Sequence, residues 1–307
     1  MSNPQTVVFL LGPTAIGKSE VAVHLARKIN AEIISCDSMQ VYKGMDIVSS
    51  APAKALLRQV AHHLLGVISP CKEYNVATYR REAMKKIRKI IKKGKVPLCV
   101  GGTGLYVSIL IDGIFQAAPA DEKIRSRLYR QAERLGSIYL YRKLKKVDPE
   151  AAEKIHPHDQ RRIIRALEVF AATGKPISQL QKRRHGLGEE YELKIICLNM
   201  PRDKLYQRID RRVEKMFRQG LVSEVKRLLR LKLSRTASQA IGIRELEGYF
   251  AGRYDLAVAK GLVKRHSRTF AKRQLTWFRR DQRINWLEVK AGEKPILTAE
   301  RIWKRLS

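Results

Sequence analysis

The stretch Gly12-Pro-Thr-Ala-Ile-Gly-Lys-Ser19 decides the fold, because it fits the pattern G-x-x-x-x-G-K-[ST] of a phosphate-binding P-loop. It follows the apolar run Val7–Leu11 and precedes a helical pattern from Glu20 to Lys28, which is the context that this motif requires. Backbone amides of such a loop and the start of the following helix attract anions. Lys18 adds a charge for phosphate oxygens, and the Ser19 hydroxyl is placed to bind Mg²⁺. The motif identifies phosphate binding but not the reaction.

Further apolar runs alternate with helical patterns along the chain. Glu32–Ser35 and Val96–Val100 predict strands, and Tyr79–Lys92 predicts a helix between them. Such alternation is typical of a parallel, doubly wound α/β sheet. A fourth apolar run, Leu193–Leu198, comes much later.

The segment between the third and fourth runs is helical and charged, from about Asp121 to His185. We interpret it as a mostly helical insertion, with Gln181–Gly188 as a basic, glycine-containing exit linker. The chain then divides into a first part of the P-loop catalytic core (1–120), the insertion (121–190) and a return to the core (191–307). Arg202–Leu231 and Asp255–Arg280 predict long helices in that last part.

Charge is the unusual feature of the composition. The 62 Lys and Arg residues outnumber 29 Asp and Glu, which gives a formal net charge of +33. Such an excess opposes compaction by self-repulsion and indicates a polyanionic partner. Nucleic acid is the first candidate and an anionic membrane surface the second.

Other features of the composition limit the class of protein. No apolar run approaches the roughly 18 to 20 residues of a membrane span, and the first apolar run leads into the glycine loop instead of a cleavage site. We therefore expect a cytoplasmic enzyme. The scattered cysteines form no C-x-x-C pair, so we expect four buried, reduced thiols and no zinc site or disulfide scaffold, at Cys36, Cys71, Cys99 and Cys197.

Polar residues follow the second and third predicted strands. In a parallel sheet, ligands bind beyond the carboxyl ends of the strands, so Asp37 should lie beside the P-loop. A carboxylate there either binds metal or accepts a proton, or else caps the next turn. The Gly101-Gly-Thr-Gly104 turn lets backbone approach a ligand and offers the Thr103 hydroxyl at the same edge.

Arginines cluster at a helix start inside the insertion. Arg161 and Arg165 fall on one helix face, and Arg162 lies next to Arg161. Such a cluster indicates either a contact with nucleic acid or a solvated basic face. The same two interpretations apply to the basic segments Lys264–Arg268 and Lys272–Arg280. His62 and His63 have no partner at ligand spacing, and we assign them no role.

Taken together, these segments resemble the bacterial tRNA dimethylallyltransferases, also called tRNA isopentenyltransferases. The resemblance covers nearly the whole chain, and its most specific part is the string from Asp37 to Ile47 beside a P-loop. The matching segments are Gly12–Ser19, Asp37–Ile47, Gly101–Tyr106, His158–Glu168, Ala240–Gly242 and Lys272–Trp277. This family transfers a dimethylallyl group from dimethylallyl diphosphate to the exocyclic amine of the adenosine at tRNA position 37, next to the anticodon.

The resemblance implies a P-loop kinase-like core that holds the donor's diphosphate with Mg²⁺, and an insertion that clamps the anticodon stem-loop. It implies catalytic roles for Asp37 as general base, for Thr103 at the leaving diphosphate and for Arg212 as a neutralising charge. The diphosphate-binding residues would be Gly12, Pro13, Thr14, Ala15, Ile16, Gly17, Lys18 and Ser19, with Ser19 also on the metal. The tRNA-binding residues would be Asp37, Ser38, Met39, Gln40, Thr103, Arg125, Gln160, Arg161, Arg162, Ile163 and Ile164.

Two positions and one segment depart from the family pattern. Ile16 stands where Ser is usual and removes one possible phosphate hydrogen bond, whereas Ser19 stands where Thr is common and keeps the hydroxyl. Val48–Pro52 replaces the usual G-T-A-K-P. The alternatives are an isopentenyltransferase for free AMP, ADP or ATP, a P-loop small-molecule kinase, and a nucleotide-gated RNA-binding module. We expect a monomer that acts on tRNA and makes no membrane contact.

Overall fold

The computed structural model describes residues 5–115, 121–182, 184–290 and 292–306. By chain contacts the protein divides into a core unit, residues 1–111 and 190–307, and an insertion unit, residues 112–189. The sequence predicts the insertion at 121–190. The insertion unit of the structure begins at residue 112, nine residues before that predicted boundary.

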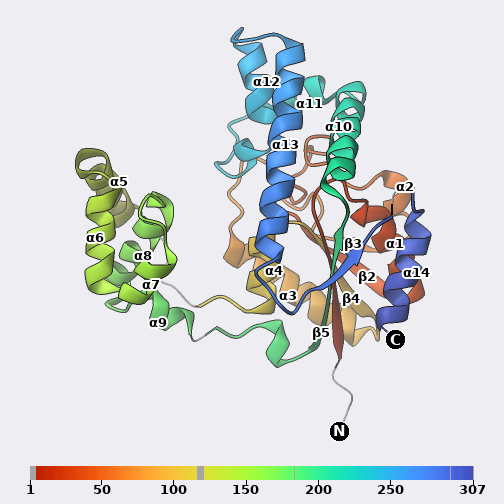
Figure 1. Cartoon of the computed structure of the whole chain (residues 1–307), viewed down its shortest axis with the longest axis horizontal. Helices are drawn as coiled ribbons and strands as arrows, with labels where there is room; N and C mark the ends of the chain where they lie inside the picture. The colour runs from red at the N-terminus through yellow and green to blue at the C-terminus, as the bar shows by residue number, and fades with distance from the viewer. Residues whose placement is uncertain (1–4, 116–120, 183, 291, 307) are drawn as a thin grey trace. The chain divides into compact units, whose positions relative to one another are not determined.

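The core unit is built on one parallel sheet of six strands in the order β3-β2-β4-β1-β5-β6 (Figure 1). The strands are β1 (Thr6–Leu11), β2 (Ala31–Cys36), β3 (His62–His63), β4 (Val96–Gly101), β5 (Glu192–Asn199) and β6 (Asn285–Glu288). The predicted α/β class is confirmed. The short edge strands β3 and β6 had not been predicted, because two and four residues carry too little pattern.

Helices cover both faces of this sheet and extend beyond its carboxyl edge. They are α1 (Lys18–Lys28), α2 (Lys54–Leu57), α3 (Val76–Lys92), α4 (Gly104–Ile111), α10 (Arg202–Arg218), α11 (Leu221–Leu228), α12 (Ile243–Phe250), α13 (Leu256–Phe278) and α14 (Pro295–Leu306). Figure 1 shows α1 and α14 together on one side of the sheet, while α10, α11, α12 and the first half of α13 rise past the ends of the strands.

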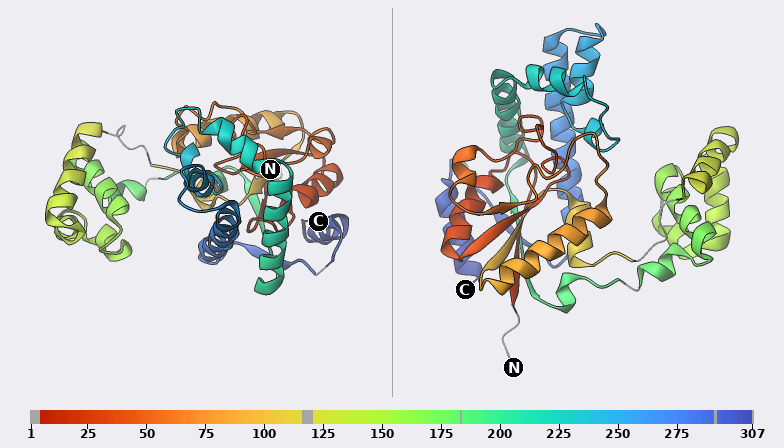
Figure 2. Two further views of the ribbon diagram at one scale, coloured as in Figure 1. Left: turned by 90° about the horizontal axis from the view of Figure 1, so that it is seen from above. Right: turned by 180° about the vertical axis from the view of Figure 1, so that it is seen from behind.

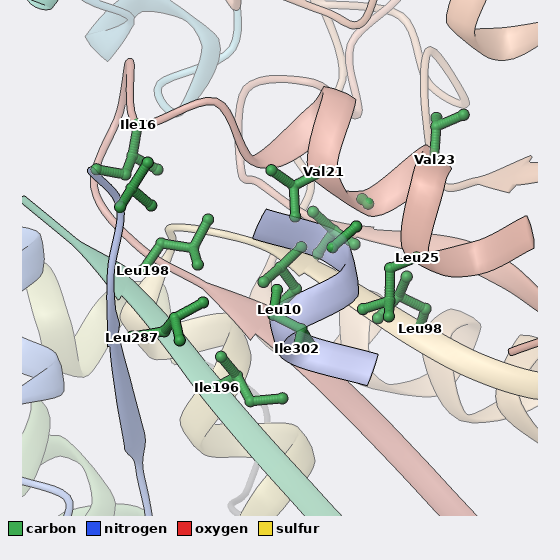
Figure 3. Packing of buried hydrophobic residues seen from close by; sticks show 14 of the residues in the cluster. Leu10, Ile16, Val21, Val23, Leu25, Leu98, Ile196, Leu198, Leu287 and Ile302 are labelled. Atoms are coloured by element: carbon green, nitrogen blue, oxygen red, sulfur yellow. The ribbon is translucent and has the colours of Figure 1, made fainter. Parts of the chain in front are cut away.

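The core packs between the sheet and these helices. Leu10, Leu98 and Ile196 from three neighbouring strands are 0%, 0% and 2% exposed, and they meet Leu25 of α1 and Ile302 of α14 (Figure 3). At roughly 1.5–3 kcal/mol for each large apolar side chain, this burial is the main force that holds the P-loop end of the sheet in place.

Two expectations about the core unit were wrong. Arg202–Leu231 is not one helix, because Gly220 adopts φ 99° and separates α10 from α11. Such a left-handed conformation favours glycine and ends a helix. Cys36, Cys99 and Cys197 are buried as expected, but Cys71 is exposed.

In its described residues the insertion unit is a bundle of α-helices, drawn in yellow to green in Figure 2. They are α5 (Glu122–Leu135), α6 (Ser137–Val147), α7 (Pro149–Lys154), α8 (Gln160–Thr173) and α9 (Ile177–Gln181). Leu140, Leu144 and Ile163, each 0% exposed, lie in its hydrophobic core. The segments that enter and leave the unit lie side by side, since a methyl group on Gly113 would come within 2.2 Å of the His185 carbonyl oxygen.

Candidate functional site

The P-loop lies at the carboxyl edge of the sheet, between β1 and α1. Gly12 and Gly17 have φ 148° and 100°, and a methyl group on Gly12 would come within 2.9 Å of the Leu198 carbonyl oxygen. Both positions therefore require glycine. Ile16 is 1% exposed and packs into the hydrophobic core (Figure 3), so this position serves packing and does not present a side chain to a ligand.

Lys18 folds back onto the loop that carries it. Its Nζ donates to the carbonyl oxygens of Gly12 and Pro13, both at 2.8 Å. Burial lowers the pKa of Lys18 to about 8, with a further lowering by Arg212 and an opposing effect of the Asp37 carboxylate. A desolvated cation whose hydrogen bonds in the described part of the chain go to carbonyl oxygens is poised to receive an anion.

A second cation reaches the loop from α10. The Arg212 guanidinium donates from Nη1 to Thr14 Oγ1 at 2.6 Å and from Nε to Ser50 Oγ at 2.9 Å. Burial lowers the pKa of Arg212 to about 10, and the Asp37 carboxylate opposes this. Ser50 lies in the segment Val48–Pro52 that departs from the family pattern, so part of that segment holds Arg212.

Arg208 lies one turn before Arg212 on the same helix and was not predicted. Its Nη2 would be 3.5 Å from a methyl group placed on Gly17. The i, i+4 spacing of the two arginines was the available signal, because it puts both on one helix face.

Asp37 follows β2 and uses one carboxylate oxygen to order its own loop. Oδ1 accepts hydrogen bonds from the backbone N–H groups of Met39 at 2.9 Å and Gln40 at 3.3 Å. Among the residues that the structure describes, Oδ2 has no hydrogen-bond partner. The capping interpretation is thus confirmed for Oδ1, while Oδ2 remains available to a substrate.

Thr103 is in contact with the loop after β2. Its Oγ1 accepts from the backbone N–H of Ser38 at 3.1 Å and donates to Ser38 Oγ at 3.4 Å. The backbone N–H of Thr103 also donates to the Cys36 carbonyl at 3.2 Å. These bonds place the hydroxyl directly beside the residue that follows Asp37.

The glycines around Thr103 serve helix packing. A methyl group on Gly102 would lie 2.2 Å from Nε2 of Gln274, and one on Gly104 would lie 2.4 Å from Cδ1 of Trp277. Helix α13 thus fills the space beside both glycines, which explains why neither carries a side chain; that the backbone here approaches a ligand stays a prediction.

The loop from Asp37 onward is held by a buried carboxylate that had not been predicted. Glu224 of α11, 8% exposed, accepts hydrogen bonds from the backbone N–H of Ile47 at 3.0 Å and of Val48 at 2.8 Å. Arg227 donates to the Gly44 carbonyl at 2.9 Å. Gln40 accepts from Ser35 Oγ at 2.9 Å. No local signal marks Glu224, because its partners lie about 177 positions earlier in the chain.

The arginines singled out from the sequence in the insertion unit divide into two groups. Arg125 and Arg165 both pair with Glu168, which is 1% exposed, through N–O distances of 3.1 and 3.0 Å. Arg161 and Arg162 are exposed at the start of α8, with Arg162 3.3 Å from Asp159.

The other predicted residues of this helix are not equivalent. Gln160 is partly exposed at the first position of α8. Ile163 and Ile164 are 0% and 2% exposed, so their side chains pack the core of the insertion unit. Any contact of these two isoleucines with RNA would have to come from their backbone.

Acidic and thiol side chains form no metal cluster in the described part of the chain. The Ser19 hydroxyl has no hydrogen-bond partner among the same residues. A single hydroxyl at the start of α1 suits Mg²⁺ that is bound mainly by phosphate oxygens and water. The described helices also include none that is long and apolar enough to cross a bilayer.

Comparisons with known proteins agree with this geometry. The family model "IPP transferase" matches residues 40–281, and the model "Isopentenyl transferase" matches residues 5–69. The tRNA dimethylallyltransferase of Halothermothrix orenii is 44% identical over 298 residues, 96% of this chain and 91% of that protein.

Two solved structures are similar to this chain over most of their length. The tRNA isopentenylpyrophosphate transferase of Bacillus halodurans superposes with a TM-score of 0.71 at 38% identity, covering 99% of this chain and 97% of the other. A eukaryotic dimethylallyltransferase acting on tRNA superposes with a TM-score of 0.78 at 28% identity, covering 92% and 74%.

Proposed function

This chain belongs to the tRNA dimethylallyltransferase family, and from that premise we propose that it transfers a dimethylallyl group from dimethylallyl diphosphate to a tRNA adenosine. The acceptor is the exocyclic amine of the adenosine at position 37. The observation that carries this proposal is the gathering of Lys18, Arg212, Asp37 and Thr103 around one P-loop.

The diphosphate of the donor binds to the loop of residues 12–19. Lys18 exchanges its two carbonyl partners for phosphate oxygens, and Arg212 supplies a second charge beside Thr14. Both cations are already desolvated, so little reorganisation is needed when charge develops on the leaving group.

Mg²⁺ would be held by the Ser19 hydroxyl together with the donor's phosphates. When bound, it neutralises charge on the diphosphate. The Ser19 hydroxyl makes no hydrogen bond in the described part of the chain, and together with the hard phosphate oxygens of the donor it fits this ion.

Transfer breaks the bond between the allylic carbon and the bridging oxygen, and it forms a bond between that carbon and the adenine nitrogen. The diphosphate leaves with the electron pair of the broken bond. The amine proton passes to Oδ2 of Asp37, while Oδ1 keeps its bonds to Met39 and Gln40. Thr103 turns its hydroxyl from Ser38 to the bridging oxygen and donates a hydrogen bond there.

The RNA partner is the anticodon stem-loop, with its adenine flipped out of the loop to reach Asp37. Ser38, Met39 and Gln40 line the path of that nucleotide, and Gln160, Arg161 and Arg162 contact the phosphate backbone from α8. The core unit carries 45 Lys and Arg against 19 Asp and Glu, and the insertion unit 17 against 10. Most of the attraction for RNA therefore comes from the core unit.

Arg125 has an indirect role in RNA binding. Its ion pair with the buried Glu168 fixes the orientation of its side chain and connects α5 to α8. We place the enzyme in the cytoplasm as a monomer, where its tRNA substrate and a reducing environment for its thiols are found.

The test is incubation with labelled dimethylallyl diphosphate, Mg²⁺ and one of two acceptors. One is an anticodon stem-loop with three consecutive adenosines, and the other is free AMP. Label on the stem-loop alone supports the proposal. Label on AMP alone would instead make the protein a free-nucleotide transferase. Label on neither, with transfer of phosphate from ATP to a small molecule in a separate assay, would make it a kinase.

A further inference from the structure

Gln274 of α13 connects the two loops that hold the proposed reacting groups. Its Oε1 accepts a hydrogen bond from the backbone N–H of Thr14 at 2.8 Å, and its Nε2 donates to the Gly102 carbonyl at 2.9 Å. The side chain is 5% exposed, although amides are usually found at the surface. The two partners lie 260 and 172 positions away in the sequence, so the bridge forms only in the complete fold.

The surroundings show that this contact is tightly packed. Gly102 has no room for a side chain because Nε2 of Gln274 occupies it, and Trp277, one turn later, does the same at Gly104. The indole Nε1 of Trp277 also donates to Ser108 Oγ at 3.3 Å. As a result, Thr103 is the one residue of this turn whose side chain faces the loop after β2.

We propose that Gln274 is a positioning residue, which sets the spacing between the P-loop and Thr103 for the transfer step. This inference rests on the proposed function. The P-loop holds the phosphates and Thr103 the bridging oxygen, so the two loops together fix the leaving group, whose bond to the allylic carbon must align with the attacking amine. A misplacement of about 1 Å between such groups costs on the order of 10²-fold in rate.

The chemistry of the amide explains why glutamine is found here. One side chain must both accept from an N–H and donate to a carbonyl within a dry contact, and a carboxamide does both. A carboxylate accepts but cannot donate, and a thioether of similar length does neither. The bond also removes the Thr14 amide from phosphate binding, which leaves Lys18 and Arg212 to neutralise that end of the diphosphate.

The experiment compares Gln274→Met and Gln274→Glu with wild type. Gln274→Met keeps the volume and removes both hydrogen bonds, whereas Gln274→Glu keeps only the bond from Thr14. Initial rates with dimethylallyl diphosphate and tRNA give kcat and KM, filter binding gives the Kd for tRNA, and hydrogen exchange of the peptide 10–18 reports the Thr14 amide. The matched control is Val263→Ala, which removes buried volume about three turns earlier in the same helix.

Positioning predicts a fall in kcat of about 10²-fold for both variants, with the Kd for tRNA within about twofold of wild type. Exchange at Thr14 should be faster in Gln274→Met, which loses the bond from that amide, and near wild type in Gln274→Glu, which keeps it. Val263→Ala should lower the melting temperature and leave kcat unchanged. A Gln274→Met enzyme with normal kcat and a lower melting temperature would overturn the inference, because the bridge would then be only structural. A wild-type enzyme that prenylates no RNA would instead overturn the proposed function.

Discussion

The charge on Lys18 should be costly in the free enzyme and relieved by the donor. Burial holds its pKa at about 8, against 10.5 for an exposed lysine. That difference corresponds to roughly 3 kcal/mol by which folding of the charged form is disfavoured. The cost is fully present below pH 8, and it disappears as the pH rises from 8 towards 10.5, because the unfolded chain binds more protons in that range.

Binding of dimethylallyl diphosphate without RNA should therefore take up protons. The bound anion raises the pKa of Lys18 again, so a neutral lysine in the free enzyme becomes charged in the complex. With a free pKa of about 8, uptake should be about 0.1 proton at pH 7, about 0.5 at pH 8 and about 0.9 at pH 9. The second phosphate ionisation of the donor, near pH 6, leaves about 0.1 of the donor protonated at pH 7, so the uptake is measured at pH 8 and 9, where that fraction is negligible.

Titration calorimetry in buffers of different ionisation enthalpy measures this uptake, and Lys18→Met supplies the second half of the test. This variant loses the charge but also two hydrogen bonds to carbonyls, which together contribute about 1–3 kcal/mol. It should be about as stable as wild type or slightly more stable at pH 7, and less stable near pH 10. The exposed Lys304→Met is the control. No proton uptake at pH 8, together with a Lys18→Met protein much less stable at pH 7, would show that burial does not destabilise the charged form of Lys18.

The remaining predictions concern the other loops. Asp37→Asn keeps an Oδ1 acceptor for Met39 and should lower turnover by about 10²-fold at nearly unchanged tRNA affinity. Near-normal turnover would show that Asp37 is not the general base. Glu224→Gln should raise exchange at the amides of Ile47 and Val48 and lower kcat, and unchanged exchange would contradict its role in holding that loop. Replacing Arg161 and Arg162 by Ala should weaken tRNA binding and reduce the slope of log K against log salt by about 0.7–1.8, and an unchanged slope would place the contacts elsewhere.

Much of the fold could be predicted because its signals are local. The P-loop motif with its flanking strand and helix fixed β1 and α1, and the apolar runs located β2, β4 and β5. The parallel arrangement then predicted that Asp37 and Thr103 would meet at one edge, since they follow neighbouring strands. The two edge strands could not be predicted, because each depends on pairing with a partner far away in the sequence.

The supporting residues of the site were not predictable for a physical reason. Gln274 and Glu224 lie on helices whose apolar periodicity says nothing about which distant backbone groups they bond. Their roles depend on buried hydrogen bonds that exist only after the chain has folded. Arg125 was predicted to bind RNA from the family pattern, and the structure adds the buried Glu168 that orients it.

The central claim is that one adenine nitrogen of a tRNA attacks the donor held by the P-loop. The most direct test is to react full-length tRNA with dimethylallyl diphosphate and to locate the modified nucleotide by mass spectrometry of nuclease fragments, with Asp37→Asn in parallel. We expect one dimethylallyl group, on the exocyclic amine of the adenosine at position 37, and far less product from the variant. Modification at another nucleotide, or equal yield from the variant, would contradict it.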